Sequence, residues 1–141
     1  MNKALDILVE NGLRKTVMRQ GILEIFLDSD IAVSQQHIET SLVKQFNRVD
    51  RITVYRTLKT FEQKGIIHKA IDGTHTPKYA LCADDCTEHA HNDTHAHFHC
   101  DDCGKTYCID EVEAPKTKAP KGFKVNSTHL VMNGLCEDCQ V

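Results

Sequence analysis

Apolar residues recur at the spacing of an α-helix four times in the first 65 positions. The first predicted helix covers residues 2–11 and ends at Gly12, a residue that commonly terminates helices. The next two begin after Thr16 and Ser34, whose hydroxyl groups are suited to capping a helix N-terminus. The fourth, ITVYRTLKTFEQKG over residues 52–65, ends on a glycine. This half is therefore predicted to be helical.

The pattern changes to that of strands after residue 65. The segments IIHKAID and KYALC, separated by the turn GTHTP, are typical of a β-hairpin over residues 66–82. Helices followed by a two-stranded ribbon predict a winged helix-turn-helix. Further along, FKVNSTHLVMNG (residues 123–134) predicts a long strand or a strand pair, and Pro115 and Pro120 interrupt any helix before it. The predicted fold class is α+β.

Charge and cysteine content divide the chain at the same place. Residues 1–81 hold 12 basic and 9 acidic residues, whereas residues 82–141 hold 5 and 11. All seven cysteines lie at or after Cys82. The sequence has no apolar run of membrane-spanning length and no signal-peptide pattern, which predicts a cytoplasmic protein without a membrane partner. Thiols stay reduced in that compartment, so we interpret these cysteines first as metal ligands.

The fourth predicted helix carries basic, hydroxyl and aromatic side chains in its first two turns. These residues are Arg51, Thr53, Tyr55, Arg56 and Lys59. A helix that enters the DNA major groove uses such residues for phosphates, guanine edges and thymine methyl groups. The alternative is the solvent-exposed face of an ordinary core helix, where arginine and lysine are common.

Four cysteines form two Cys-x-x-Cys pairs, Cys100 with Cys103 and Cys136 with Cys139. Two-residue spacing lets both sulfurs of a pair face one ion, and two pairs complete a tetrahedral sulfur shell that favours Zn²⁺. Gly104 suits the tight turn after the first pair. Four unrelated thiols, or a redox pair, are the alternatives. The spacing predicts a structural zinc site.

Alternating histidines precede the first pair. On a strand, His95, His97 and His99 share one face. They are either specific metal ligands or part of a histidine-rich loop that binds metals loosely. The neighbouring Cys86, His89 and His91 are expected in a mobile loop with at most a weak metal site, and His99 has no assigned role.

The blocks GLRKTVMRQGILEIF, RITVYRTLKTFEQKGII and HFHCDDCG, in this order, resemble the ferric uptake regulator (Fur) family of metal-responsive repressors, and most of all its zinc uptake regulator branch. The resemblance implies a winged-helix DNA-binding domain over residues 1–82, a hinge and histidine-rich loop over 83–94, and a small α/β metal-binding dimerisation domain over 95–141. It also implies roles for DNA-contacting residues. These are Tyr55 and Arg56 on the recognition helix, Arg19 on a phosphate, and Lys15 towards the minor groove. Arg51 and Thr53 are added from the pattern of the helix described above.

The resemblance further implies a regulatory metal site at the hinge. His95 and His97 match the sensory histidines, and Cys82 matches a hinge cysteine of zinc-sensing members. Iron- and peroxide-sensing members commonly carry a histidine where this chain has Ala32. The predicted ligands are His68, Cys82, His95 and His97. Cys108, at a position where many relatives carry Asp or Glu, is a possible additional ligand, a replacement for His97, or a small packed side chain.

The prediction is a homodimeric transcriptional repressor, not an enzyme, that binds a pseudo-palindromic double-stranded DNA operator when its regulatory site holds a divalent ion. Zn²⁺ is the favoured ion, because a thiolate beside iron and oxygen invites oxidation. A regulator of the same fold that responds to Fe²⁺, Mn²⁺ or peroxide is the first alternative. A zinc buffer or storage module is another. The sequence has no His-x-Glu placed before a cysteine pair, as in zinc deaminases, and no His-Glu-x-x-His pattern of zinc hydrolases, and no small-molecule substrate is expected.

Overall fold

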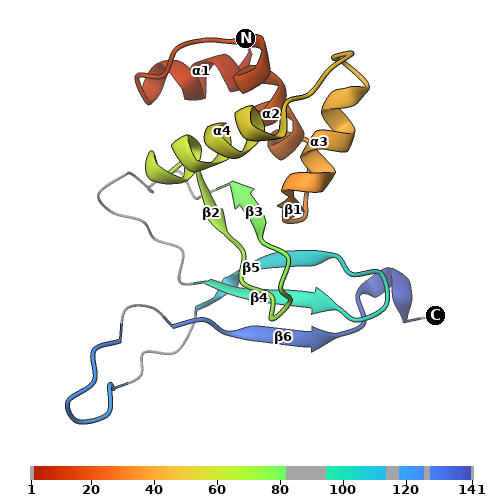
Figure 1. Ribbon diagram of the computed structural model, residues 1–141. Helices are drawn as coiled ribbons and strands as arrows, with labels where there is room; N and C mark the ends of the chain where they lie inside the picture. The colour runs from red at the N-terminus through yellow and green to blue at the C-terminus, as the bar shows by residue number, and fades with distance from the viewer. Residues whose placement is uncertain (1, 82–94, 114–117, 126–127, 141) are drawn as a thin grey trace.

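The computed structural model describes residues 2–81, 95–113, 118–125 and 128–140, and it has a helical part stacked on a small β-sheet (Figure 1). Four helices form the first part. They are α1 (Lys3–Glu10), α2 (Val17–Leu27), α3 (Gln35–Val43) and α4 (Arg51–Gln63). Among the described residues, the structure contains no helix that is both long and apolar enough to cross a membrane.

Each helix begins at a side chain that caps its N-terminus. The Thr16 hydroxyl accepts a bond from the Arg19 N–H at 3.1 Å, and the Ser34 hydroxyl accepts from His37 N–H at 3.1 Å. These bonds satisfy amide donors that have no partner within the helix. Helix α4 ends at Gln63, and Gly65 just after its C-cap Lys64 has a φ of +78°, which only glycine adopts readily. The helices expected from the apolar pattern are thus confirmed.

The ribbon after α4 has one strand more than the sequence predicts. Strands β2 (Ile67–Lys69) and β3 (Lys78–Leu81) form the expected antiparallel hairpin, and the short β1 (Val33–Ser34) pairs with β3 to give the order β1-β3-β2. The third strand arises because Ser34 caps α3 from an extended conformation, with φ −85° and ψ 164°. The predicted hairpin is present, but the sheet that contains it has three strands instead of the two expected. Four helices with this ribbon form the winged helix.

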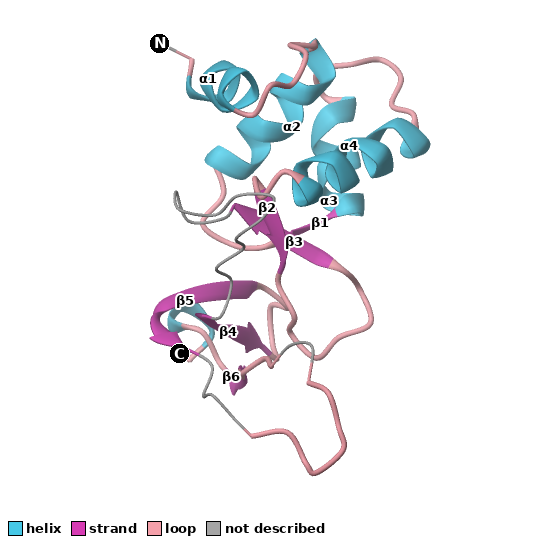
Figure 2. Cartoon of the chain, turned by 90° about the vertical axis from the view of Figure 1, so that its left-hand side faces the viewer, coloured by secondary structure: helices cyan, strands magenta, loops and turns pink. Residues whose placement is uncertain are grey.

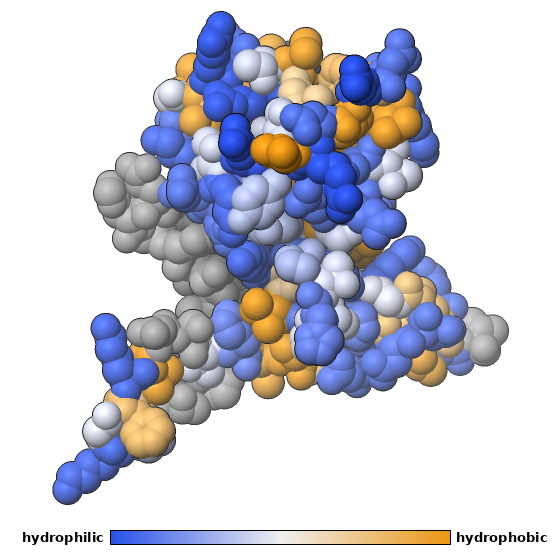
Figure 3. All heavy atoms as spheres, in the orientation of Figure 1, coloured by the Kyte–Doolittle hydropathy of each residue, from blue (hydrophilic) through white to orange (hydrophobic). Residues whose placement is uncertain are grey.

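Apolar faces of all four helices enclose one core with the ribbon. Its fully buried side chains include Leu8, Ile22, Leu42, Leu58 and Phe61. Burial of a side chain of this size contributes about 2 kcal/mol. On the face of the helices seen in Figure 3, hydrophilic side chains alternate with smaller apolar areas, which is ordinary for a protein surface.

The second part is a three-stranded sheet. It contains β4 (His95–Cys100), β5 (Thr106–Glu113) and β6 (Val131–Gly134) in the order β5-β4-β6, followed by the short 3₁₀-helix η1 (Glu137–Cys139). Strand β4 is antiparallel to β5 and parallel to β6. Within the described part of residues 123–134, only Val131–Gly134 is a strand, so the long strand expected there is shorter than predicted.

The hairpin of the winged helix touches the second sheet directly. In Figures 1 and 2 the β2–β3 hairpin extends from below α4 to β4 and β5. The Ala32 N–H donates to the Thr106 carbonyl at 2.8 Å. Ala32, Ala70 and Ala80 form a buried cluster against Cys108. These small side chains let the two parts approach closely.

Candidate metal centres and nucleic-acid interface

The four Cys-x-x-Cys sulfurs meet at one end of the second sheet. Cys100 ends β4 and Cys103 lies in the following turn, which Gly104 closes with a φ of +77°. Cys136 and Cys139 flank and end the short helix η1. Parallel pairing of β4 with β6 brings the two knuckles together. All four sulfurs lie within 4.8 Å of one another.

This arrangement fits a tetrahedral zinc ion. Sulfurs bound to zinc at about 2.3 Å lie about 3.8 Å apart at the corners of a tetrahedron. The sulfurs of Cys103 and Cys136 are 3.8 Å apart. The Cys136 N–H donates to the Cys100 sulfur at 3.4 Å, and this bond together with other backbone N–H groups lowers the pKa of Cys100 to about 6. The neighbouring Cys136 sulfur raises the pKa of Cys139. Crowded thiols of this kind ionise fully when a cation binds among them.

A second cluster forms between the hairpin and the second sheet. His68 of β2, His97 of β4 and Cys108 of β5 place their ligand atoms within 4.8 Å of one another. His68 Nε2 lies 3.9 Å from Cys108 Sγ, and the two imidazole centroids are 6.0 Å apart. A nitrogen and a sulfur on one tetrahedral zinc lie about 3.6 Å apart. The site therefore needs little adjustment to hold such an ion.

Burial and strand register explain how this cluster arises. His68 is 2% exposed and His97 1% exposed, so both imidazoles are within the contact between the two parts of the chain. His97 and Cys108 are direct partners in the β4–β5 ladder. Partners in an antiparallel pair project from the same face of a sheet. Cys108 thus joins His97 in this cluster instead of replacing it.

The structure describes no side chain for the other two predicted ligands of this site, Cys82 and His95. Cys82 follows the end of β3 and lies outside the described residues, as do Cys86, His89 and His91. His95 begins β4, but its side chain is not among those described, and the β4–β5 register shifts between His95 and Ala96. The expectation that three alternating histidines share one face therefore holds for the described pair His97 and His99.

Ala32 occupies a buried position beside the second cluster. It is 4% exposed and belongs to the alanine cluster that packs against Cys108. A methyl group here offers no ligand atom. Among the described residues, the donor set at this centre is therefore two nitrogens and one sulfur.

His99 contacts a different set of residues. It shares the sheet face of His97 but lies beside Thr106 and Asp72. Sequence reasoning missed Asp72, Lys78 and Thr106, which form a buried polar network with this histidine. No local motif marks these residues, because they become neighbours only when the hairpin reaches the second sheet.

The predicted DNA-facing residues lie at the surface. Arg51, Thr53, Tyr55 and Arg56 of α4 are exposed, as is Lys15, whereas Arg19 is half-buried. The opposite face of α4 is buried, with Val54, Leu58 and Phe61 at most 1% exposed. Lys59 lies over the Tyr55 ring at 5.6 Å. Arg51 is paired with Glu39 at 3.2 Å, and the Thr53 hydroxyl donates to Asp50.

A winged helix, a sheet with a four-cysteine centre and a second ligand cluster between them define a metal-responsive DNA-binding regulator. The model of the ferric uptake regulator family matches residues 10–133, and the chain belongs to this family. Its members are transcription regulators and not enzymes. The fold prediction, a winged helix with a small second domain, is confirmed.

The relatives include regulators of several metals. A curated ferric uptake regulation protein of Staphylococcus epidermidis is 34% identical over 142 residues, covering 99% of this chain and 95% of the relative. The structure of a zinc-bound manganese uptake regulator matches with a TM-score of 0.67 and 23% identity, covering 95% of this chain and 99% of that one. A zinc uptake regulator complexed with zinc and DNA matches with a TM-score of 0.66 and 24% identity, covering 97% and 90%.

Proposed function

We propose that this chain is a zinc-responsive transcriptional repressor that binds a pseudo-palindromic DNA operator as a homodimer. The observation that carries the proposal is the buried cluster of His68, His97 and Cys108, because its ligands come from both parts of the chain. An ion held there joins the hairpin of the winged helix to the second sheet. Its occupancy can therefore be sensed as a change in the position of the DNA-binding domain.

The donor set supports zinc as the regulatory ion. A thiolate and two imidazoles form a set that zinc accepts in tetrahedral geometry, whereas Mn²⁺ prefers carboxylate and water oxygens. Ala32 removes the extra imidazole that the resemblance leads one to expect in iron- and peroxide-sensing members. A fourth ligand comes from Cys82 or from His95, since Cys82 directly follows Leu81, the ladder partner of Ile67 next to His68.

A specific observation favours an iron-responsive alternative. The S. epidermidis relative, which aligns with nearly the whole chain, is named a ferric uptake regulation protein. Fe²⁺ accepts imidazole ligands, and the two imidazoles of the cluster also suit it. The Cys108 thiolate argues against this assignment, because iron with oxygen beside a thiolate promotes its oxidation.

The four-cysteine centre has a different proposed role. All of its ligands come from the second sheet and the segment that follows it, so a zinc ion there closes one small unit. Zinc with four sulfurs has no open coordination position and no redox chemistry. We assign this ion a structural role, holding the C-terminal segment against β4.

Operator binding is assigned to the N-terminal half of α4. Tyr55 and Arg56 are exposed there, with Arg51 and Thr53 one turn earlier, and Lys15 and Arg19 are assigned to backbone contacts. The remaining side of α4 is anchored in the core. A recognition helix needs this combination of a rigid buried face and a polar outer face.

Dimerisation is assigned to the outer edge of β5, beyond the bridge between Thr106 and Ala32. This strand is an outer strand of its sheet, and its outer edge is bridged by Ala32 at Thr106 within the described part of the chain. A second copy can pair along the rest of β5 through a two-fold axis, which joins the two sheets and covers their exposed edges. Two recognition helices then read two half-sites.

The decisive experiment measures DNA affinity of each metal-loaded form. Fluorescence anisotropy would use the full chain and a duplex selected from a random library, with buffered Zn²⁺, or Fe²⁺ or Mn²⁺ without oxygen. Zinc exceeds iron and manganese in affinity for most such sites, so each ion is compared at saturation. We expect the zinc form to bind DNA at least about tenfold tighter than the other forms. Equal or tighter binding by the Fe²⁺ form would support the iron-responsive alternative.

A pair of variants tests the site itself. Cys108→Ser removes the sulfur ligand, and His37→Ala removes an exposed histidine of α3 as a matched control. We expect the first variant to lose the zinc response of DNA binding and the second to keep it. If Cys108→Ser responds to zinc like the unmodified chain, the cluster is not the regulatory site.

A further inference from the structure

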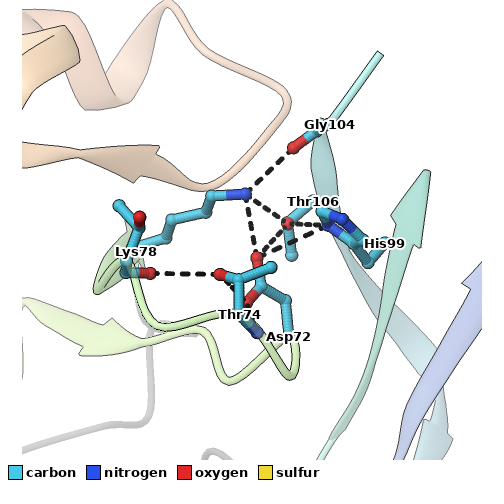
Figure 4. A network of polar contacts seen from close by, with 7 residues as sticks. Asp72, Thr74, Lys78, His99, Gly104 and Thr106 are labelled. Carbon is cyan, nitrogen blue, oxygen red and sulfur yellow. Dashed lines mark hydrogen bonds and ion pairs between the residues drawn. The ribbon is translucent and has the colours of Figure 1, made fainter. Parts of the chain in front are cut away.

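A buried network of polar side chains joins the β2–β3 hairpin to the second sheet (Figure 4). At its centre is Asp72, whose side chain is 2% exposed. Its Oδ1 accepts from the Thr74 N–H at 2.9 Å and from the Thr74 hydroxyl at 2.6 Å. Its Oδ2 lies 2.8 Å from Lys78 Nζ and accepts from the Thr106 hydroxyl at 2.7 Å.

Lys78 extends this network across the contact. Besides Asp72, its ammonium group donates to the Gly104 carbonyl at 2.9 Å and to the Thr106 hydroxyl at 3.0 Å. An ammonium group has three N–H donors, so all three are engaged. Two of these partners belong to the second sheet and its turn, and one to the hairpin itself. Lys78 thus binds the hairpin to the sheet directly.

His99 completes the network from β4. Its Nδ1 lies 3.2 Å from Thr106 Oγ1 and 3.5 Å from Asp72 Oδ2. The Thr106 hydroxyl gives its one proton to Asp72 and accepts from Lys78, so its remaining lone pair is available to an N–H. This count assigns a proton to His99 Nδ1. It also gives a function to the one histidine of β4 that sequence reasoning left unassigned.

The surroundings of Asp72 keep its carboxyl group ionised. Burial alone would raise the pKa of Asp72, but the bonds from Lys78, Thr74 and Thr106 outweigh it and hold the pKa well below its ordinary value. The carboxylate therefore stays charged and bonded at any pH at which the protein works. A charge pair this well bonded fixes geometry more than it adds net stability.

The network and the second ligand cluster occupy the same contact. Asp72 lies four residues after His68 in the hairpin, His99 lies two after His97 in β4, and Thr106 lies two before Cys108 in β5. Residues two apart on a strand project from the same face. Each ligand of the cluster therefore has a member of the polar network on its own strand or hairpin.

We propose that Asp72, Lys78, Thr106 and His99 form an interdomain clasp that positions the ligands of the regulatory metal site. This inference rests on the proposed role of His68, His97 and Cys108. A metal ion binds most tightly when its ligands are already assembled, because its binding free energy is not used to bring the two parts of the chain together. The observed affinity falls by the fraction of molecules in the assembled state. The clasp raises this fraction before the ion arrives.

The test measures zinc affinity of the regulatory site in the full chain with the structural zinc retained. Asp72→Asn removes the charge but keeps the size of the side chain. Competition with a fluorescent zinc chelator should show at least about tenfold weaker binding of the second zinc ion. Glu62→Gln is the matched control, since it removes a carboxylate of an ion pair within α4, and its zinc affinity should not change.

A second variant keeps the proposal testable if Asp72→Asn fails to fold. Thr106→Val keeps the shape of the side chain and removes the hydroxyl that links Lys78, Asp72 and His99. We expect about threefold weaker zinc binding, and a double variant with Asp72→Asn that binds no more weakly than Asp72→Asn alone, since both changes open the same clasp. Additive losses, or second-site affinity equal to that of the unmodified chain in the folded variants, would overturn the proposal and leave the network a structural contact only.

One further variant separates this proposal from the proposed function. His97→Gln removes a ligand and should weaken second-site binding by about a thousandfold. If His97→Gln has this effect and Asp72→Asn has none, the clasp is wrong and the regulatory site stands. If His97→Gln leaves second-site binding intact, the regulatory site is wrong, and the clasp falls with it.

Discussion

The two candidate metal centres differ in where their ligands come from. The four cysteines belong to β4, its turn and the segment after β6, all within the second part of the chain. His68, His97 and Cys108 come from three strands in two different sheets. An ion in the first centre closes one unit, whereas an ion in the second joins two. We therefore assign zinc a structural role in the first centre and a regulatory role in the second.

The surroundings of the centres differ in the same sense. Cys103 is exposed, while His68 and His97 are buried between the hairpin and the second sheet. The first centre is held by backbone N–H groups of its own knuckles, such as that of Cys136. The second has a polar network beside it that crosses the contact. Local bonds suffice for a closed site, whereas a site between domains needs contacts that set their relative position.

The largest effect is expected at the four-cysteine centre. Cys103→Ser removes a ligand from an exposed position, so almost no packing is lost and any effect acts through the metal. We expect one zinc ion fewer per chain and a fall of roughly 15 °C in the thermal unfolding midpoint, because structural zinc contributes directly to folding. Elemental analysis and circular dichroism would measure both. Comparable midpoint shifts for Cys103→Ser and Cys108→Ser would remove the distinction between the centres.

The next effect concerns the second centre alone. His97→Gln should weaken binding of the regulatory zinc by about a thousandfold, or about 4 kcal/mol, since one of its nitrogen ligands is gone. The structural zinc should remain. Chelator competition and elemental analysis on the same sample would report both values, with His37→Ala as control. Loss of both ions together would mean that the two centres are not independent.

A third prediction concerns how much the contact between the hairpin and the second sheet contributes to the free energy of unfolding when no regulatory ion is bound. Asp72→Ala leaves Lys78 without its carboxylate partner in a largely buried position, where its side chain is 14% exposed. Breaking such a pair costs about 3 kcal/mol in the free energy of unfolding. Glu62→Gln, in the more exposed pair with Lys59, should change it by less than about 0.5 kcal/mol. Urea unfolding with only the structural zinc bound would test this, and equal effects would argue against a special role for the hairpin contact.

The smallest predicted effect is on DNA affinity, and it leaves both metal centres unchanged. Arg56→Ala should lower DNA affinity about tenfold and, if the guanidinium binds a phosphate, reduce the salt dependence by about one counterion. Zinc content should not change at either centre. Lys118→Ala, an exposed basic residue of the second part, is the matched control. An equal loss of affinity for both variants would indicate nonspecific attraction instead of a contact made by α4.

Much of the fold could be predicted from local sequence. Thr16 and Ser34 cap the helices that the apolar pattern predicts, and Gly65 ends α4 as expected. The four-cysteine centre was also predictable, since each knuckle is specified by two-residue spacing. These features depend on residues a few positions apart, whose geometry the backbone determines by itself.

The second centre and the clasp could not be derived in this way. That Cys108 lies opposite His97 depends on the register of β4 with β5, and that His68 reaches both depends on where the hairpin packs. Asp72, Lys78, Thr106 and His99 become partners only through the same packing. The sequence alone determined the helices, their caps and the staple, because these are short-range properties. Tertiary structure decided which residues meet between the two sheets, because strand register and domain contact are long-range properties that no local pattern encodes.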